Sequence, residues 1–314
     1  MTNQEIMALL EKAAITTQVA TTVSAEDASE FIDLALEQVS VLNKFQVERN
    51  ITTGRKLSTL ELGEPVTHED VENTDPEAGE VITPTFGEKQ LTPAGVRLDY
   101  DVTFDMIREN IEGEGINETL NMLFSKRHGK DMVMMAFRGD TTLADDTRTN
   151  KALRAFDGIN KQAADSSNTH ILNTGTSTSL TDTDDLAGEV FSEMLKLLPE
   201  DYKDPEGLAF EVSWDDYYRY LDQISARGTE LGDRALTGQW QPNYNGIPVV
   251  PLFKQVSTHR ILTPLKNVAI GWGREWEKGQ DVYNRAGRIE ITIRTGVDAK
   301  IVLDDALVMA YPVD

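Results

Sequence analysis

The chain has 314 residues, no cysteine and a formal net charge of −23, from 30 basic and 53 acidic residues. Its length allows about two domains, and the lack of cysteine excludes disulfides, Cys-ligated zinc and a thiol nucleophile. Such negative charge disfavours sequence-independent wrapping of nucleic acid. No stretch approaches the ~20 apolar residues of a membrane span, and no signal-like pattern opens the chain, so we expect a soluble protein.

The N-terminal residues 1–47 are predicted to be mainly helical. Apolar residues recur at helical spacing in two stretches that a Thr-rich interruption separates. Ser24 and Asp27 offer a capping-box start for the second helix, which would carry Phe31 and Leu42. Isolated helices of this length are marginal in water, so we expect this arm to pack on the body or on another subunit.

A segment punctuated by proline and glycine follows, between Gly54 and Gly95. Over residues 61–95 it holds nine acids against one base, Lys89. A loop this long inside a compact domain is unusual unless it has a function. One interpretation is a solvated acidic linker.

The alternative interpretation is an extended hairpin that lies on a neighbouring subunit. Its acids would then face bases on the long helix that is predicted further along the chain. The candidate contact residues are Glu64, Glu69, Asp70 and Glu72 on the hairpin, and Lys126, Arg127 and Lys130 on the helix.

The stretch from residue 96 to 140 predicts a strand followed by a long helix. Apolar residues occupy every second position from Val96 to Phe104, which is the period of a half-buried strand. After Gly115 the spacing becomes helical, with an apolar side that includes Leu123 and Met132 and a basic, exposed side. Gly139 is interpreted as a C-cap glycine followed by a turn.

The rest of the chain predicts a mixed α/β region and a β-rich end. Helices are expected over 184–198 and 214–224, with a short strand at 208–212 between them. The prolines of residues 246–251 favour an edge strand. Alternating isoleucines from Ile289 predict strands up to residue 311.

The residues give no support to a metal, cofactor or catalytic site. The four histidines do not fall in pairs at metal-ligand spacing on one element. The sequence holds no dinucleotide loop, phosphate loop or nucleophile elbow. With 53 carboxylates present, any nominated catalytic pair would carry almost no information.

Taken in order, these features resemble the major capsid protein of tailed bacteriophages, with its Hong Kong 97-type (Johnson) fold. The acidic hairpin before a strand and long helix carries part of the resemblance. The other matching segments are Phe137-Arg138-Gly139-Asp140, Phe156-Asp157-Gly158-Ile159, Met194 to Pro199 with Tyr202, Phe210 to Leu221, Gly246 to Val250, Ala269-Ile270-Gly271 and Ile289 to Tyr311.

The resemblance implies an α+β fold and a role for each part of the chain. Residues 1–47 would be an N-terminal arm and 48–100 an extended loop. Residues 101–160 and 266–314 would form a peripheral domain with the long spine helix, and 161–265 an α/β axial domain. Such proteins self-assemble into pentamers and hexamers of an icosahedral shell around double-stranded DNA.

The resemblance also implies partners and a location. Only about 47 residues precede the loop, so we expect a separate scaffolding protein or none, and no cleaved segment. A portal is a further expected partner, whether a cement protein decorates the surface is left open by the sequence, and DNA would be enclosed without sequence-specific binding. The shell would be a virion capsid assembled in the host bacterial cytoplasm. Some relatives join subunits through a Lys–Asn bond, but no motif carries that bond to Lys56 or Lys89.

Two other functions remain open from the sequence. The first is an encapsulin-type nanocompartment, a shell of the same fold that holds an enzyme cargo. The second, from a different class, is an acidic hydrolase that works through paired carboxylates. Particle contents would separate the first from a phage capsid, and activity as a small oligomer would indicate the second.

Overall fold

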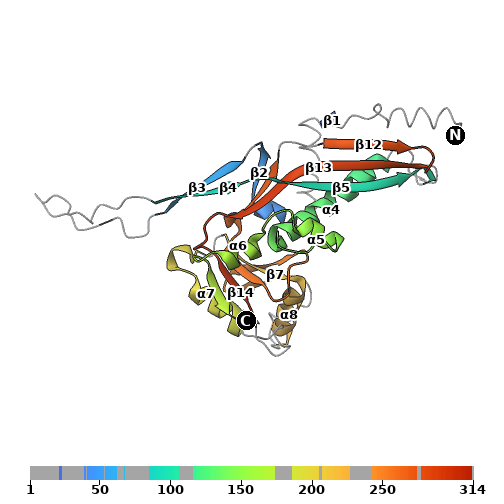
Figure 1. The fold of residues 1–314 in the computed structure, drawn as a ribbon. Helices are drawn as coiled ribbons and strands as arrows, with labels where there is room; N and C mark the ends of the chain where they lie inside the picture. The colour runs from blue at the N-terminus through green and yellow to red at the C-terminus, as the bar shows by residue number, and fades with distance from the viewer. Residues whose placement is uncertain are drawn as a thin grey trace, which may run out of the picture.

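The computed structural model describes residues 21–22, 39, 41–52, 54–61, 67, 85–105, 116–173, 186–204, 207–226, 242–273 and 277–312. These residues form two six-stranded sheets and a separate two-stranded ribbon, with helices between and below the sheets (Figure 1). No described helix is long and apolar enough to cross a membrane.

The first sheet carries the long predicted strand. Its order is β1-β12-β13-β11-β2, with β5 paired to the other edge of β13. The strands are β1 (Thr21–Thr22), β2 (Gln46–Ile51), β5 (Ala94–Thr103), β11 (Val268–Gly273), β12 (Glu277–Tyr283) and β13 (Arg288–Ile301). Neighbouring strands are antiparallel except β2, which runs parallel to β11.

The alternation predicted for β5 is confirmed. Arg97, Asp99 and Asp101 are exposed, whereas Leu98 and Tyr100 between them are partly buried. The buried side packs on helix α4 (Ile116–Arg138), where the rings of Tyr100 and Phe124 stack at 3.8 Å between centroids. The period-2 pattern therefore identified the face that the helix covers.

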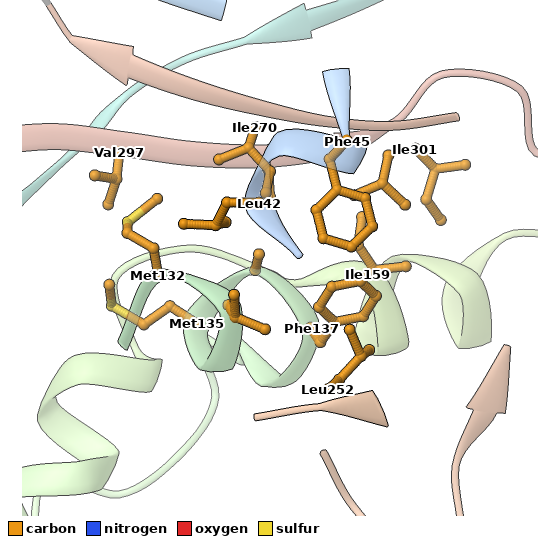
Figure 2. Packing of buried hydrophobic residues seen from close by; sticks show 14 of the residues in the cluster. Leu42, Phe45, Met132, Met135, Phe137, Ile159, Leu252, Ile270, Val297 and Ile301 are labelled. Atoms are coloured by element: carbon orange, nitrogen blue, oxygen red, sulfur yellow. The ribbon is translucent and has the colours of Figure 1, made fainter. Parts of the chain in front are cut away.

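The main core lies between the first sheet and the C-terminal half of α4. Figure 2 shows Leu42 and Phe45 pointing towards the helix, where Met132 and Phe137 lie. The rings of Phe45 and Phe137 are 5.6 Å apart. Residues 132–137 are all buried, because strands cover this half of α4 on one side and shorter helices on the other.

The second sheet forms the lower body in Figure 1. Its order is β6-β14-β10-β7-β9-β8. The strands are β6 (His170–Asn173), β7 (Leu208–Ser213), β8 (Asn243–Tyr244), β9 (Ile247–Leu252), β10 (Arg260–Pro264) and β14 (Val308–Tyr311). The helical elements in this region are a π-helix η3 (Leu186–Phe191), α7 (Ser192–Leu197) and α8 (Trp214–Ser225), and their apolar faces bury Phe191, Phe210 and Tyr220.

The remaining elements connect these bodies. They are the 3-10 helices η1 (Leu42–Lys44), η4 (Glu200–Tyr202) and η5 (Leu265–Asn267), and the short helices α5 (Arg148–Leu153) and α6 (Ile159–Asp165). The strand predicted over 208–212 and the helix over 214–224 are confirmed, and the helix predicted over 184–198 is helical from Leu186 to Leu197, first as η3 and then as α7. The ribbon pairs β3 (Arg55–Glu61) with β4 (Thr85–Leu91) and projects beyond the body (Figure 1).

Two glycines allow the end of α4 to meet the start of α6. A Cβ added to Gly139 would lie 2.3 Å from the Phe156 carbonyl oxygen, and one added to Gly158 would lie 2.6 Å from the Gly139 nitrogen. The Gly158 N–H donates to the Gly139 carbonyl over 2.9 Å. The prediction that Gly139 follows the helix end is confirmed, but the C-cap reason was wrong. Its φ is not positive, unlike that of Gly54, Gly207, Gly246 and Gly287.

Three further expectations need correction. Leu123 was placed on the apolar side of α4 but is 61% exposed. The strand with the prolines, β9, is not at the edge, because the two-residue β8 pairs outside it. Residues 266–314 do not all return to the first sheet, because β14 pairs with β10 and β6 in the second.

The N-terminal arm also differs from the prediction where it is described. Thr21 and Thr22 form β1 at the edge of the first sheet, and Leu42 lies in a 3-10 turn instead of a long helix. Residues 46–51 form β2 at the edge of the first sheet, next to β11. The end of the predicted arm is therefore part of the core, because Leu42 and Phe45 are fully buried there. The capping pair Ser24 and Asp27 lies outside the described residues.

Candidate functional site

The ribbon of β3 and β4 is attached to the body through one of its two faces. Leu57 and Leu91 on that face are buried against Ile51. On the same face the Lys89 Nζ lies 2.8 Å from the Asp304 carboxylate. The base of the ribbon is thus held by apolar burial and an ion pair, while its outer part has no described support from its own chain.

The opposite face of the ribbon carries an exposed aromatic side chain. Phe86 is 78% exposed, the largest exposed fraction among the large apolar side chains that the structure describes. In the strand register it stands opposite Leu60. Closer to the body on this face, Lys56 and Glu88 form an ion pair. Sequence reasoning missed Phe86, because nothing in its local pattern distinguishes an exposed ribbon residue from a buried strand residue.

The predicted acidic contact residues lie beyond the described part of the ribbon. Glu64, Glu69, Asp70 and Glu72 fall within residues 62–84, of which only Thr67 is described. Their position relative to the basic residues of α4 therefore stays a prediction.

The predicted bases of α4 are found on one side of the helix. Lys126 and Arg127 are exposed and Lys130 is half-buried, at the i, i+1 and i+4 positions of that face. Arg127 is engaged within the chain, because its Nη2 lies 2.9 Å from the Asp131 carboxylate. The Arg127 and Lys130 cations also lie 5.8 and 5.5 Å from the ring centre of Phe253. The basic face is therefore weaker than the sequence suggested.

Apolar side chains continue this exposed face towards the start of α4. Met122 is 50% exposed and Leu123 is 61% exposed. Leu123 precedes Lys126 by three residues and Arg127 by four, so these side chains are neighbours on the helix surface. These side chains form a strip on the helix surface with an apolar end and a basic end. We call it the α4 strip and define it as Met122, Leu123, Lys126, Arg127 and Lys130.

A second exposed apolar group lies at the start of α8. Trp214 and Tyr218 are exposed, and their ring centres are 5.7 Å apart. A buried ion pair holds this end of the helix, because the Arg260 Nε lies 2.8 Å from the Asp216 carboxylate. Desolvation raises the pKa of Asp216, and the Arg260 charge opposes that shift. The sequence did not indicate this ion pair, because its partners are 44 residues apart.

Glu211 is an unusual residue in the middle of the second sheet. Its side chain is completely buried between Val250 on β9 and Ile261 on β10 in the strand register. Neither carboxylate oxygen has a hydrogen-bond partner among the described residues. Desolvation raises the pKa of Glu211 well above its usual value, which favours the neutral, protonated form of the buried carboxyl.

The described residues offer no metal site. They contain no group of three His, Asp or Glu side chains that could hold a metal ion. His128 is buried in α4, and desolvation lowers its pKa to about 4, so it is neutral near pH 7.

Comparisons with known proteins found one curated relative and a number of solved structures of similar fold. No family model matches the chain. It is 23% identical over 309 residues to a Bacillus subtilis (strain 168) protein whose name describes a prophage capsid protein, and the match covers 94% of both chains.

Solved structures share the fold over nearly the whole chain. The satellite phage P4 procapsid matches with a TM-score of 0.68 and 14% identity, over 99% of this chain and 97% of that one. Mycobacterium phage Ogopogo matches with a TM-score of 0.57 and 11% identity, over 96% and 95% of the two chains. The capsid of the native GTA particle has a TM-score of 0.54 at 10% identity, with 96% of each chain covered. The predicted α+β architecture is confirmed: this chain has the Hong Kong 97-type fold of tailed-bacteriophage major capsid proteins.

Proposed function

We propose that this chain is a structural major capsid protein that self-assembles into the icosahedral shell of a tailed bacteriophage or prophage. The observation that carries the proposal is the match of nearly the entire chain, ribbon included, to the satellite phage P4 procapsid. The prophage capsid name of the Bacillus subtilis relative supports the same function. The shell is built of pentamers and hexamers and encloses double-stranded DNA.

The shape and charge of the molecule suit that function. A ribbon that projects from the body and exposed apolar groups on α4 and α8 provide surface for large contacts between copies, and obligate interfaces bury more than ~2,000 Å² in total. The net charge of −23 repels phosphates. DNA is therefore enclosed without tight binding to the wall.

The parts of the chain have separate roles in this proposal. The first sheet and α4 form the peripheral domain, and the second sheet with α7 and α8 forms most of the axial domain near the fivefold and sixfold centres. Residues 1–47 act as an arm up to the point where η1 enters the core. The ribbon is the extended loop, and its acids Glu64, Glu69, Asp70 and Glu72 contact Lys126, Arg127 and Lys130 of a neighbouring copy.

Other proteins complete the particle in this proposal. They are a separate scaffolding protein and a portal through which DNA enters. Assembly takes place in the cytoplasm of the bacterial host. Lys56 and Lys89 act as ordinary ion-pairing lysines here, because Lys56 contacts Glu88 and Lys89 contacts Asp304.

Two alternatives are less favoured. An encapsulin-type nanocompartment has the same kind of shell, but the prophage capsid name of the curated relative favours a phage shell. An acidic hydrolase would need a built catalytic pair. The buried carboxylates of Asp216 and Glu211 do not provide one, because the first pairs with Arg260 and the second lies inside a sheet.

Sedimentation of the purified protein, followed by analysis of the particle contents, tests the proposal. A capsid protein sediments as capsomers or as much larger shells, and particles from the producing bacterium contain genomic DNA. Particles filled with an enzyme cargo would support the nanocompartment instead. A protein that stays monomeric across concentration and salt would contradict both shell functions.

A further inference from the structure

The exposed Phe86 of the ribbon is the starting point of a further inference. A two-stranded hairpin is marginally stable in water, and an aromatic side chain that is 78% exposed gains nothing from the fold of its own chain. The other face of the ribbon already meets the body through Leu57 and Leu91. Phe86 therefore points away from the only described apolar support that the ribbon has.

The α4 strip has the complementary character. Met122 and Leu123 form its apolar end, and Lys126 follows directly on the same side of the helix. The ribbon combines an apolar residue, Phe86, with an acidic distal segment: residues 61–80 contain eight acids and no lysine or arginine. The ribbon, with Phe86 next to acids, is thus complementary to the α4 strip, where apolar side chains lie next to bases.

The charges of neighbouring residues distinguish the α4 strip from the other exposed apolar surface, which is formed by Trp214 and Tyr218. Around Trp214 and Tyr218 the exposed charged residues include Asp215 and Asp222, both acidic. The nearby base Arg219 is half-buried, and its guanidinium lies 3.7 Å from the Asp216 carboxylate. Acids of the ribbon would meet like charge there, which disfavours docking. The bases beside Leu123 attract the same acids, even though Arg127 is partly neutralised by Asp131.

The contact has to join two copies of the chain. Figure 1 shows the ribbon projecting to the left of the body, whereas α4 lies under β5 within the body. Tyr100 of β5 stacks on Phe124, which places this part of α4 close to the end of β5 that is remote from the ribbon. The occupant of the α4 strip is therefore the ribbon of a second copy.

We propose that Phe86 is the apolar anchor of the contact between subunits and that Met122 and Leu123 of a neighbouring copy are its seat. This inference rests on the proposed shell function and adds the residues through which the ribbon binds the neighbouring copy. In the shell, burial of the phenyl ring contributes the affinity, and the acid–base contacts beside it set the direction in which the ribbon lies.

The absence of cysteine allows a direct test by thiol crosslinking. The variant Phe86→Cys with Leu123→Cys is assembled and treated with a short bis-maleimide. Denaturing gels are expected to show a ladder of covalent dimers and higher oligomers, because each copy links to the next. The matched control is Thr59→Cys with Leu123→Cys, which places the thiol on the other face of the same ribbon, and it is expected to remain monomeric on the gel.

A second pair makes the outcome decisive. In Phe86→Cys with Tyr218→Cys the second thiol lies on α8, and we expect no ladder. A ladder from this pair but none from the Leu123 pair would overturn the inference. Shells that form normally, with no ladder from the Leu123 pair, would also overturn it while leaving the capsid function intact. Absence of any particle, even for the unsubstituted chain, would instead refute the proposed function.

Assembly thresholds give an independent readout. The variant Phe86→Ser removes the ring without adding a charge, and the concentration needed for assembly is expected to rise about tenfold or more, as the loss of one buried aromatic side chain implies. Glu88→Gln, on the same ribbon face, is the control and should change this concentration little. An unchanged threshold for Phe86→Ser would contradict the anchor role.

Discussion

The contact between Gly139 and Gly158 gives the sharpest test of how the long helix is held in the body. Replacing Gly158 by alanine would place a Cβ 2.6 Å from the Gly139 nitrogen and 2.7 Å from the Ala136 carbonyl oxygen. Both are backbone atoms, so no flexible side chain can move to make room. The end of α4 and the start of α6 have to separate, and the Gly158 to Gly139 hydrogen bond is strained or lost.

The expected loss is at the upper end of what overpacking costs, about 3 kcal/mol. For a chain of this size that loss lowers the melting temperature by roughly 5–10 °C. Unfolding of the unassembled protein can be followed by fluorescence of Trp272, which is fully buried in the same core. The matched control is Gly95→Ala, because a Cβ at Gly95 meets nothing within 4 Å.

The control variant should be as stable as the unsubstituted chain or slightly more stable, since alanine restricts the unfolded chain. Equal melting temperatures for Gly158→Ala and Gly95→Ala would refute the close-contact explanation. A lower melting temperature in Gly158→Ala without any decrease in Gly139→Ala would also count against it, because a Cβ on either glycine meets backbone atoms of the other segment.

Three further changes test the second sheet and the ribbon. Glu211→Gln should stabilise the protein increasingly as pH rises above about 4.5, because above that pH the carboxyl ionises in the unfolded chain while the folded state keeps it protonated. The gain in unfolding free energy, measured by urea unfolding, is at most ~1.4 kcal/mol per pH unit. The same pH dependence of the unfolding free energy in both proteins would contradict this. Arg260→Met should destabilise by about 3–5 kcal/mol by leaving a buried carboxylate, and adding Asp216→Leu should restore most of the loss in the same assay; no restoration would argue against the ion pair as the cause. The last variant replaces three ribbon acids with lysine: Glu69, Asp70 and Glu72. It should lower shell yield in sedimentation while the melting temperature of the unassembled protein stays the same, and unchanged yield would indicate a solvated loop.

Local periodicity predicted which residues form the elements and which face they bury. The alternation of β5 and the helical spacing of α4 identified the contact that Tyr100 and Phe124 make. The same reasoning failed at Leu123, which is exposed although the next residue, Phe124, packs on β5. Periodicity reports a face but not how far the covering surface extends.

Long-range pairing could not be read from the sequence. Residues 46–51 have mixed polarity and are mostly half-buried, and their parallel pairing joins them to β11, far along the chain. The segments around Gly139 and Gly158 supported the resemblance to capsid proteins before their role was visible. Two backbones that approach through glycines far apart in the sequence leave no local pattern beyond the glycines themselves.

The candidate contact surface was predicted only in part. The bases of α4 are where the helical spacing placed them, but Asp131 and Phe253 engage two of them within the chain. Phe86 was missed, because its function depends on what remains uncovered after folding. Exposure of an apolar residue is a property of the folded surface and cannot be derived from composition.

Electron microscopy of the purified protein tests the central claim most directly. Under conditions that favour assembly, the account predicts closed icosahedral shells in which the ribbon of each subunit lies across its neighbour. A uniform population of monomers, with no capsomers or shells at any concentration or ionic strength, would contradict it.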